Sequence, residues 1–257
     1  MEVTTRPPRV VTQTQQLVNR ARHVFPGGSV GNIYGDLIIR EGRGGHIFDV
    51  DGNEYIDGLA GLWNVLVGHG RRELAETAYN QCETLAYASG YTGSSNERAI
   101  ELAEHLAGLT YPSINRFFFT CGGGEATDSS VKMSRAYWKL RGQSAKTKVI
   151  SRIDGYHGVT LAAMSATGIS GYWPMFEPRV PGFSHISSPY PYRYEAPEGI
   201  SPGIAAANEL EQKILEEGPE TVAMFLAEPV QGAGGILIPP DDYFPRIREI
   251  CDQYDVL

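Results

Sequence analysis

The feature that most constrains the fold is the alternation of short apolar runs with longer amphipathic stretches after residue 115. The runs that predict buried strands are Phe117–Phe119, Val149–Ile150 and Val222–Leu226. The stretches with helical periodicity are residues 125–140, 159–166, 204–215 and 243–254. Because each helical stretch is too long for a hairpin connection, the strands are expected to run parallel. The sequence therefore predicts an α/β domain with a mostly parallel, doubly wound sheet.

The N-terminal part has a different pattern. Residues 1–11 predict a loose arm, and the apolar spacing within residues 12–25 predicts a helix. Strand-like runs follow at residues 37–40, 46–50 and 54–57, with Asp51-Gly52 as a hairpin signal between the last two. Two amphipathic helices are then expected, at residues 74–85 and 99–106. We therefore predict a small antiparallel meander that precedes the parallel sheet.

Composition excludes several classes of protein. The net charge of −8 has the wrong sign for binding nucleic acid or an anionic membrane surface. No apolar run approaches the roughly 18 residues that a membrane span needs. The three cysteines form no CxxC pair, and the six histidines show no metal-ligand spacing. We expect an acidic cytoplasmic protein without a metal site.

The first candidate loop is a run of three glycines, Gly122, Gly123 and Gly124, between a predicted strand and a predicted helix. Backbone N–H groups at such a helix N-terminus are free to bind an anion, which indicates a phosphate site. The loop lacks the Gly-Lys-Ser/Thr of a Walker motif and also the GxGxxG pattern. The alternative interpretation is a flexible connector.

Two further loops follow predicted strands, where ligands bind in parallel sheets. Tyr156 and His157 stand between Gly155 and Gly158, which suits a platform for a planar ligand. The alternative is a tyrosine packed into a turn. Glu228 ends an apolar strand before a proline, where it could bind a ligand or cap a neighbouring helix.

The three loops in this order resemble the class III pyridoxal-phosphate aminotransferases of fold type I. The resemblance includes the hairpin at residues 47–58, the segment at residues 62–70 and the stretch at residues 228–232. The closest pattern is that of the ω-amino acid and amine:pyruvate branch. It implies pyridoxal 5'-phosphate as cofactor, an amine and a keto acid as substrates, and a homodimer. It also implies that residues 1–68 are the arm, helix and meander of a small α+β domain, and residues 69–257 an incomplete large cofactor-binding domain.

The resemblance assigns roles to the loop residues. Gly122, Gly123 and Gly124 match the family's Ser-Gly-Ser phosphate turn, Tyr156 the aromatic that stacks on the pyridine ring, and His157 the residue after it. Glu228 matches the glutamate beside the cofactor. Glycines replace both serines, so up to two hydroxyl donors are lost, each worth about 1.5–3 kcal/mol. We therefore expect weaker cofactor retention.

Three aromatic residues match the family's substrate pocket: Trp63, Tyr91 and again Tyr156. For Trp63 the alternative is packing in the core. The loop that carries Tyr91 matches the family only loosely.

The family's Schiff-base lysine and the aspartate that pairs with the pyridine nitrogen match no residue up to Leu257 and are expected beyond it. Val256 and Leu257 would begin the strand that delivers this aspartate. The chain's own lysines predict solvated surfaces; they are Lys132, Lys139, Lys146, Lys148 and Lys213. The resemblance thus implies the N-terminal part of a transaminase, inactive alone.

Other interpretations remain open at this point. A pyridoxal-phosphate aminomutase or decarboxylase would share the fold. A nucleotide-binding dehydrogenase would also alternate strands with helices, although the chain lacks GxGxxG. A non-catalytic truncated subunit would explain the missing lysine.

Overall fold

The computed structural model describes Leu17, residues 37–91 and residues 93–257. It divides the chain into two compact units, Met1–Pro112 and Ser113–Leu257, which we describe separately. The predicted arm, and the predicted helix at residues 12–25 apart from Leu17, lie outside the described residues. The boundary at residue 68 that the resemblance implied stays a prediction, because division by packing is a different criterion.

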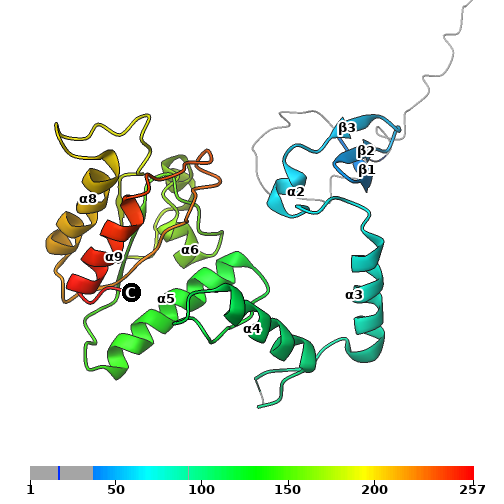
Figure 1. Cartoon of the computed structure of the whole chain (residues 1–257), viewed down its shortest axis with the longest axis horizontal. Helices are drawn as coiled ribbons and strands as arrows, with labels where there is room; N and C mark the ends of the chain where they lie inside the picture. Colours follow the sequence, from blue (N-terminus) through cyan, green and yellow to red (C-terminus); the bar gives the residue numbers. More distant parts are fainter. Residues whose placement is uncertain (1–16, 18–36, 92) are drawn as a thin grey trace, which may run out of the picture. The chain divides into compact units, whose positions relative to one another are not determined.

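The first unit contains the antiparallel meander. Its elements are β1 (Ile39–Arg43), β2 (His46–Asp49), β3 (Glu54–Ile56), α2 (Ala60–Trp63), α3 (Arg72–Leu85) and α4 (Glu97–Leu109) (Figure 1). The strands pair in the order β1-β2-β3. The first strand begins later than the predicted residues 37–40 and extends to Arg43.

The hairpin between β2 and β3 depends on one carboxylate. Oδ1 of Asp49 accepts the N–H groups of Asp51 and Asn53, at 2.9 and 2.8 Å. Oδ2 accepts from the Asn53 amide at 2.8 Å and from the Tyr55 hydroxyl at 2.9 Å. These hydrogen bonds, above all that from the Asn53 side chain, lower the pKa of Asp49 to about 2. The Asp51-Gly52 turn signal therefore marks a real hairpin, which a side chain stabilises from within.

The second unit is the parallel α/β domain. Its elements are α5 (Gly123–Leu140), β4 (Lys148–Arg152), α6 (Leu161–Ala166), the 3-10 turn η1 (Ser170–Tyr172), α7 (Trp173–Phe176), β5 (Phe183–Ile186), α8 (Pro202–Glu217), β6 (Val222–Phe225) and α9 (Tyr243–Gln253). The sheet has the order β5-β4-β6, and both strand pairs are parallel. The predicted parallel sheet is confirmed for the described residues.

Helices cover both faces of this sheet. On one face α8 and α9 lie side by side (Figure 1) and bury Leu210, Ile214 and Ile250 against Ile150 of β4. On the other face α5 contributes Val131, which packs with Val149 and Met224. Neighbouring residues of β4 thus point to opposite layers, as the two-residue period of a strand requires. The domain is doubly wound.

Two predictions about strands were wrong. Phe117–Phe119 forms no strand, and the side chains of Phe118 and Phe119 are 65% and 48% exposed. An apolar run becomes a strand only where a neighbouring strand pairs with it, and no described strand does so here. Conversely, β5 lies within residues 167–202, whose high content of Pro, Tyr and Gly predicts a surface stretch between the elements on either side.

The last two residues continue the sheet beside β6. The N–H of Phe225 donates to the carbonyl of Leu257 at 2.8 Å, and the N–H of Leu257 donates to the carbonyl of Ala223 at 3.1 Å. Val256 is only 2% exposed. Bonds from one residue to two alternate residues of its neighbour are those of a parallel pair. The expectation that a core strand starts here agrees with this pairing.

One lysine is not on a solvated surface. Lys146 is 3% exposed, and its ammonium group lies 4.7 Å from the centre of the Trp138 ring. Its Nζ donates to four carbonyl oxygens, those of Pro219, Val222, Tyr254 and Asp255, at 2.9–3.1 Å. We call this arrangement the Lys146 cage. Burial lowers the pKa of Lys146. The prediction of a solvated lysine failed here because a cation without a carboxylate partner can be satisfied by backbone carbonyls, which leave no trace in the sequence.

Candidate functional site

The glycine run forms the N-terminus of α5, as predicted. Gly122 is the N-cap, and no side chain caps the helix. The first helical bond runs from Ala126 N–H to Gly122 O at 3.0 Å. Within the part of the chain that the structure describes, the N–H groups of Gly123, Gly124 and Glu125 have no hydrogen-bond partner. A long helix that presents free donors at its positive end attracts an anion.

The loop at residues 154–158 packs directly against this helix start. The hydroxyl of Thr127 donates to the carbonyl of His157 at 2.8 Å. A Cβ placed on Gly158 would lie 2.7 Å from the Cα of Gly124, and Gly158 has a φ of 127°. Only glycine fits both the conformation and the space. The glycine turn and the tyrosine loop are therefore one packed unit.

A second bond pair strengthens this junction. Oδ1 of Asp128, on α5, accepts the hydroxyl of Thr160 at 2.8 Å and the N–H of Ala163 at 2.9 Å. Because these groups lie at the start of α6, Asp128 satisfies free donors of one helix from the side of another.

The two loops enclose a cavity of about 360 Å³. The residues that line it are Gly123, Gly124, Thr127, Tyr156, His157, Gly158 and Val159. The structure thus brings together four of the predicted cofactor residues, and Gly122 adjoins them as the N-cap of α5. The Tyr156 side chain is 39% exposed, so its ring has a free surface. Backbone donors and an aromatic ring share one concave surface of suitable size for a phosphorylated aromatic ligand.

Glu228 reaches this site through the backbone of Tyr156. Its Oε1 accepts the Tyr156 N–H at 2.9 Å, and its Oε2 accepts the Gly232 N–H at 3.0 Å. The predicted alternative, a helix cap, is not what Glu228 does, because both of its donors belong to loops. The carboxylate fixes the loop that carries the ring. We call this contact the Glu228–Tyr156 bond.

His157 contributes a neutral imidazole. Its Nε2 is buried and has no hydrogen-bond partner among the described residues. Burial, followed by the positive charge of Arg152 and the nearby His185, lowers the pKa of His157 to about 4. Near pH 7 the ring is uncharged, so one ring nitrogen is available to a ligand or to water.

The predicted substrate aromatics belong to the first unit. Trp63 is 46% exposed and has a φ of 62°, so it is not a core residue of the unit described. Tyr91 is 97% exposed. Because the two units are described separately, the roles of Trp63 and Tyr91 stay predictions.

Sequence reasoning missed two residues that line the cavity, Thr127 and Val159, and one residue that bonds to the Glu228 carbonyl, Arg152. Thr127 could have been found, since it follows the glycine run by one helical turn. Val159 directly follows the Tyr-His-Gly segment and is 83% exposed. Arg152 ends an apolar strand, and a charged residue at such a position signals that its side chain has a specific partner.

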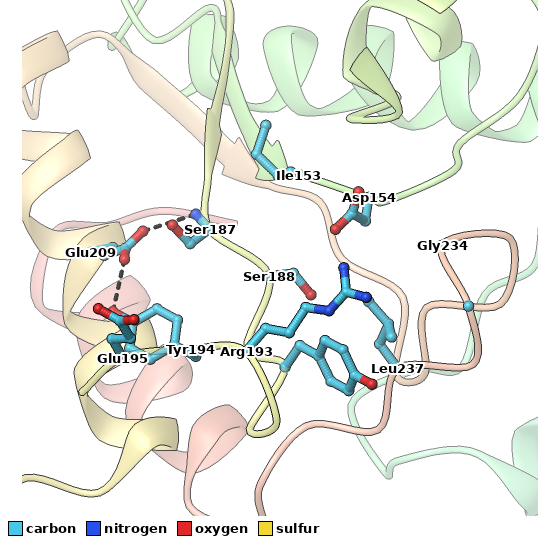
Figure 2. Close-up of a pocket in the computed structure, with 12 residues that line it drawn as sticks. Ile153, Asp154, Ser187, Ser188, Arg193, Tyr194, Glu195, Glu209, Gly234 and Leu237 are labelled. Atoms are coloured by element: carbon cyan, nitrogen blue, oxygen red, sulfur yellow. Dashed lines mark hydrogen bonds between the residues drawn. The ribbon is translucent and has the colours of Figure 1, made fainter. Parts of the chain in front are cut away.

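A larger cavity of about 750 Å³ lies beyond the ends of β4 and β5 (Figure 2). Figure 2 shows Arg193 reaching towards Asp154 and Ser188. Glu209 forms part of the wall; it accepts the Ser187 N–H at 2.8 Å and the Tyr194 hydroxyl at 2.7 Å. None of the residues predicted to bind the cofactor lines this cavity. Its walls are polar and contain no helix N-terminus.

The described residues contain neither a helix that could span a membrane nor a cluster of metal-binding side chains. None of their helices has the length and apolarity to cross a membrane. They also contain no cluster of three or more His, Cys, Asp or Glu side chains that could hold a metal ion.

Comparison with known proteins identifies the family. Residues 29–257 match the family model "Aminotransferase class-III". The chain belongs to the class III aminotransferases, which use pyridoxal phosphate. The free donors at α5 and the exposed ring of Tyr156 fit this cofactor, because they would receive its phosphate and its pyridine ring.

The chain matches only part of the length of each relative. The chain is 41% identical over 253 residues to the putrescine–pyruvate aminotransferase of Pseudomonas aeruginosa. This alignment covers 96% of this chain and 55% of that protein. A thermostable (S)-enantioselective ω-transaminase from Thermomicrobium roseum matches with a TM-score of 0.86 and 42% identity, over 94% of this chain and 55% of that one. The ω-transaminase of Pseudomonas jessenii, solved in complex with pyridoxamine phosphate (PMP), matches with a TM-score of 0.85 and 37% identity, over 96% and 55%. The chain spans about half the length of these relatives.

Proposed function

We propose that this chain is the part of an amine or ω-amino acid transaminase that binds the phosphate and one face of pyridoxal phosphate. Pyruvate is the proposed amino acceptor, because the Pseudomonas aeruginosa relative is named as a pyruvate aminotransferase. The single observation that carries the proposal is the 360 Å³ cavity, where free N–H groups of α5 and the ring of Tyr156 meet.

Different residues would bind different parts of the cofactor. The N–H groups of Gly123 and Gly124 would receive the phosphate, and the positive end of α5 would stabilise its charge. Tyr156 would stack on the pyridine ring, held in place by the Glu228–Tyr156 bond. The neutral ring of His157 would close the pocket beside them. When bound, the cofactor supplies the electron sink that transamination needs.

The lysine and the aspartate of the reaction are not assigned to this chain. We propose that they lie beyond Leu257 in a longer protein, which would form a homodimer. The chain alone is then expected to bind the cofactor without turning it over.

The test is equilibrium binding of pyridoxamine phosphate to the 257-residue chain, followed by quenching of intrinsic fluorescence. Pyridoxamine without the phosphate is the matched ligand. We expect the phosphorylated form to bind at least about ten-fold more tightly, because charge-assisted hydrogen bonds contribute about 1.5–3 kcal/mol each. Equal binding of the two ligands would contradict the proposal.

Two variants sharpen this test. Gly123→Asp places a negative charge at the helix start, and nothing lies within 4 Å of a Cβ there. It is expected to abolish the preference for the phosphorylated ligand. Ala136→Asp adds the same charge at an exposed position of the same helix and is expected to leave that preference unchanged.

A chemical test addresses the missing lysine. The chain is incubated with pyridoxal phosphate, reduced with borohydride and digested for mass spectrometry. No stoichiometric adduct is expected on Lys132, Lys139, Lys146, Lys148 or Lys213. A stoichiometric adduct on one of them would contradict the assignment. In a full-length protein, dependence of turnover on a keto acid would separate a transaminase from an aminomutase or a decarboxylase.

A further inference from the structure

Arg152 is the largest side chain that the described structure buries completely. It ends β4, and only 1% of its surface is exposed. Its Nε and Nη1 have no hydrogen-bond partner among the described residues. No carboxylate forms an ion pair with it in that part of the chain. Since a buried charge without an ion-pair partner is costly, its position calls for a physical reason.

The contacts of Arg152 join three elements. Its Nη2 donates to the carbonyl oxygen of Glu228, just after β6. Its guanidinium lies 5.7 Å from the ring centres of both Tyr243 and Phe244, at the start of α9. Cation–π contacts of this kind compensate part of the desolvation cost. The residue therefore links the ends of β4 and β6 under the aromatic start of α9.

The backbone that Arg152 holds is the one that carries the site. Glu228 presents its carbonyl to Arg152 and its carboxylate to Tyr156 and Gly232. Gln231 adds a parallel link, from its Nε2 to the Ile153 carbonyl at 2.8 Å. If the Glu228 backbone shifted, its carboxylate would leave the Tyr156 N–H.

We propose that Arg152 is a positioning residue for the pyridoxal-phosphate pocket: its bond to the Glu228 carbonyl sets the carboxylate that holds the Tyr156 loop. Arg152 itself does not line the cavity and touches no ligand. Its value for cofactor binding rests on the proposed function, whereas its action on the Glu228–Tyr156 bond does not.

The charge of Arg152 has a second effect on the same loop. Two hydroxyls bond the backbone of His157 and not its ring: Thr127 donates to its carbonyl at 2.8 Å, and Thr167 accepts its backbone N–H at 3.0 Å. The groups whose charge influences the ring are Arg152 and His185 on β5. Arg152 is the fixed positive charge among them. It favours the neutral imidazole, in addition to the effect of burial.

The test is amide hydrogen exchange in the whole chain, read at single residues by NMR. In Arg152→Met, exchange at Tyr156 and Gly232 is expected to accelerate about ten-fold or more, because each amide loses a charge-assisted bond. Exchange at Leu226, whose N–H donates to the Ile150 carbonyl at 2.8 Å in the sheet, is expected to stay unchanged. Equal acceleration at all three amides would show a merely structural role and overturn the proposal, as would no acceleration at Tyr156.

Further variants keep the outcome clear. Arg152→Lys retains the charge but not the reach of the guanidinium, so it should accelerate exchange at Tyr156 and leave the titration of His157 in place. This variant also serves if Arg152→Met does not fold. Arg141→Met removes an exposed charge after the far end of α5 and should change neither readout.

Cofactor binding is measured in parallel. Arg152→Met is expected to weaken pyridoxamine phosphate binding about ten-fold, which is the consequence of the positioning effect. If the unchanged chain does not prefer pyridoxamine phosphate to pyridoxamine, the proposed function fails while the exchange result still decides the role of Arg152. If binding is intact but exchange at Tyr156 does not respond to Arg152→Met, the positioning role fails alone.

Discussion

The two ends of the parallel sheet each bury a cation, but they differ in how completely that cation is hydrogen-bonded. Before β4, Lys146 donates to four carbonyl oxygens. At the other end of β4, Arg152 donates to one carbonyl, and two of its nitrogens have no partner within the described residues. The buried Nε2 of His157, near that end, also has no partner among those residues.

This difference in hydrogen bonding indicates that Lys146 serves stability, whereas the surroundings of Arg152 serve function. Buried polar groups in native proteins are usually satisfied, and exceptions concentrate where a structure has to bind or move something. The Lys146 ammonium has four acceptors, and Lys146 lines neither of the two cavities described above. The Arg152 end is incompletely satisfied and adjoins the cavity where the family's cofactor residues meet. Unsatisfied groups at the carboxyl ends of the strands therefore point to the site.

The largest effect is expected at the Lys146 cage. Lys146→Met leaves four carbonyl oxygens without their donor, so the free energy of unfolding should fall by about 3–5 kcal/mol. Urea denaturation followed by circular dichroism measures this loss. Lys132→Met, at an exposed position of α5, is the control. A loss below about 1 kcal/mol would show that the cage is not what holds this end together.

The second prediction concerns pH. The pKa of His157 is about 4 in the folded chain and 6.5 in the unfolded chain, so the unfolded state binds the proton more readily between these values. Stability should fall as the pH drops from 6.5 to 4, by at most about 3 kcal/mol. His157→Gln is expected to remove this part of the pH dependence. An unchanged slope in the variant would assign the acid sensitivity to other groups.

The third prediction restores hydroxyl donors to the glycine turn. Gly122 has an extended backbone with nothing within 4 Å of a Cβ, so Gly122→Ser is accommodated without strain. It should tighten pyridoxamine phosphate binding about ten-fold, equivalent to one charge-assisted bond. At Gly124 a Cβ would lie 3.3 Å from Thr160 Cγ2, so Gly124→Ser should gain less. Unchanged affinity in both variants would reject the hypothesis of weaker retention.

The smallest effect on stability is expected at Arg152. Replacing this incompletely paired charge by Met also removes its desolvation cost, so the free energy of unfolding should change by less than about 1 kcal/mol. The same urea experiment compares Arg152→Met with Lys146→Met. Equal losses in the two variants would erase the distinction between the two ends of the sheet.

The sequence predicted most of the fold because local patterns determine it. The predicted helices at residues 125–140 and 204–215 correspond to α5 and α8, whose apolar spacing is clear. Its failures have non-local causes. Phe117–Phe119 has the composition of a strand but no pairing partner among the described strands. β5 has a partner in β4, but only Ile186 of its four residues is fully buried, so its sequence pattern is weak.

The site was predictable in its parts but not in its bonds. The glycines and Tyr156 carry local signals, and the cavity unites them. The Glu228–Tyr156 bond spans 72 positions, and the Arg152–Glu228 contact spans 76. No periodicity or turn signal encodes such pairs, because they arise only when the strands assemble. For the same reason Lys146, with bonds to positions 73–109 residues away, was predicted to lie at a solvated surface.

The close approach of Gly158 to Gly124 limits how this pocket can diversify. A side chain at Gly158 would displace the glycine turn, so variation there would affect folding and phosphate binding together. Val159, by contrast, lines the same cavity and is 83% exposed. A library that varies this pocket should therefore keep the two glycines constant and vary Val159. The evolvable part of the pocket begins one residue after its most constrained point.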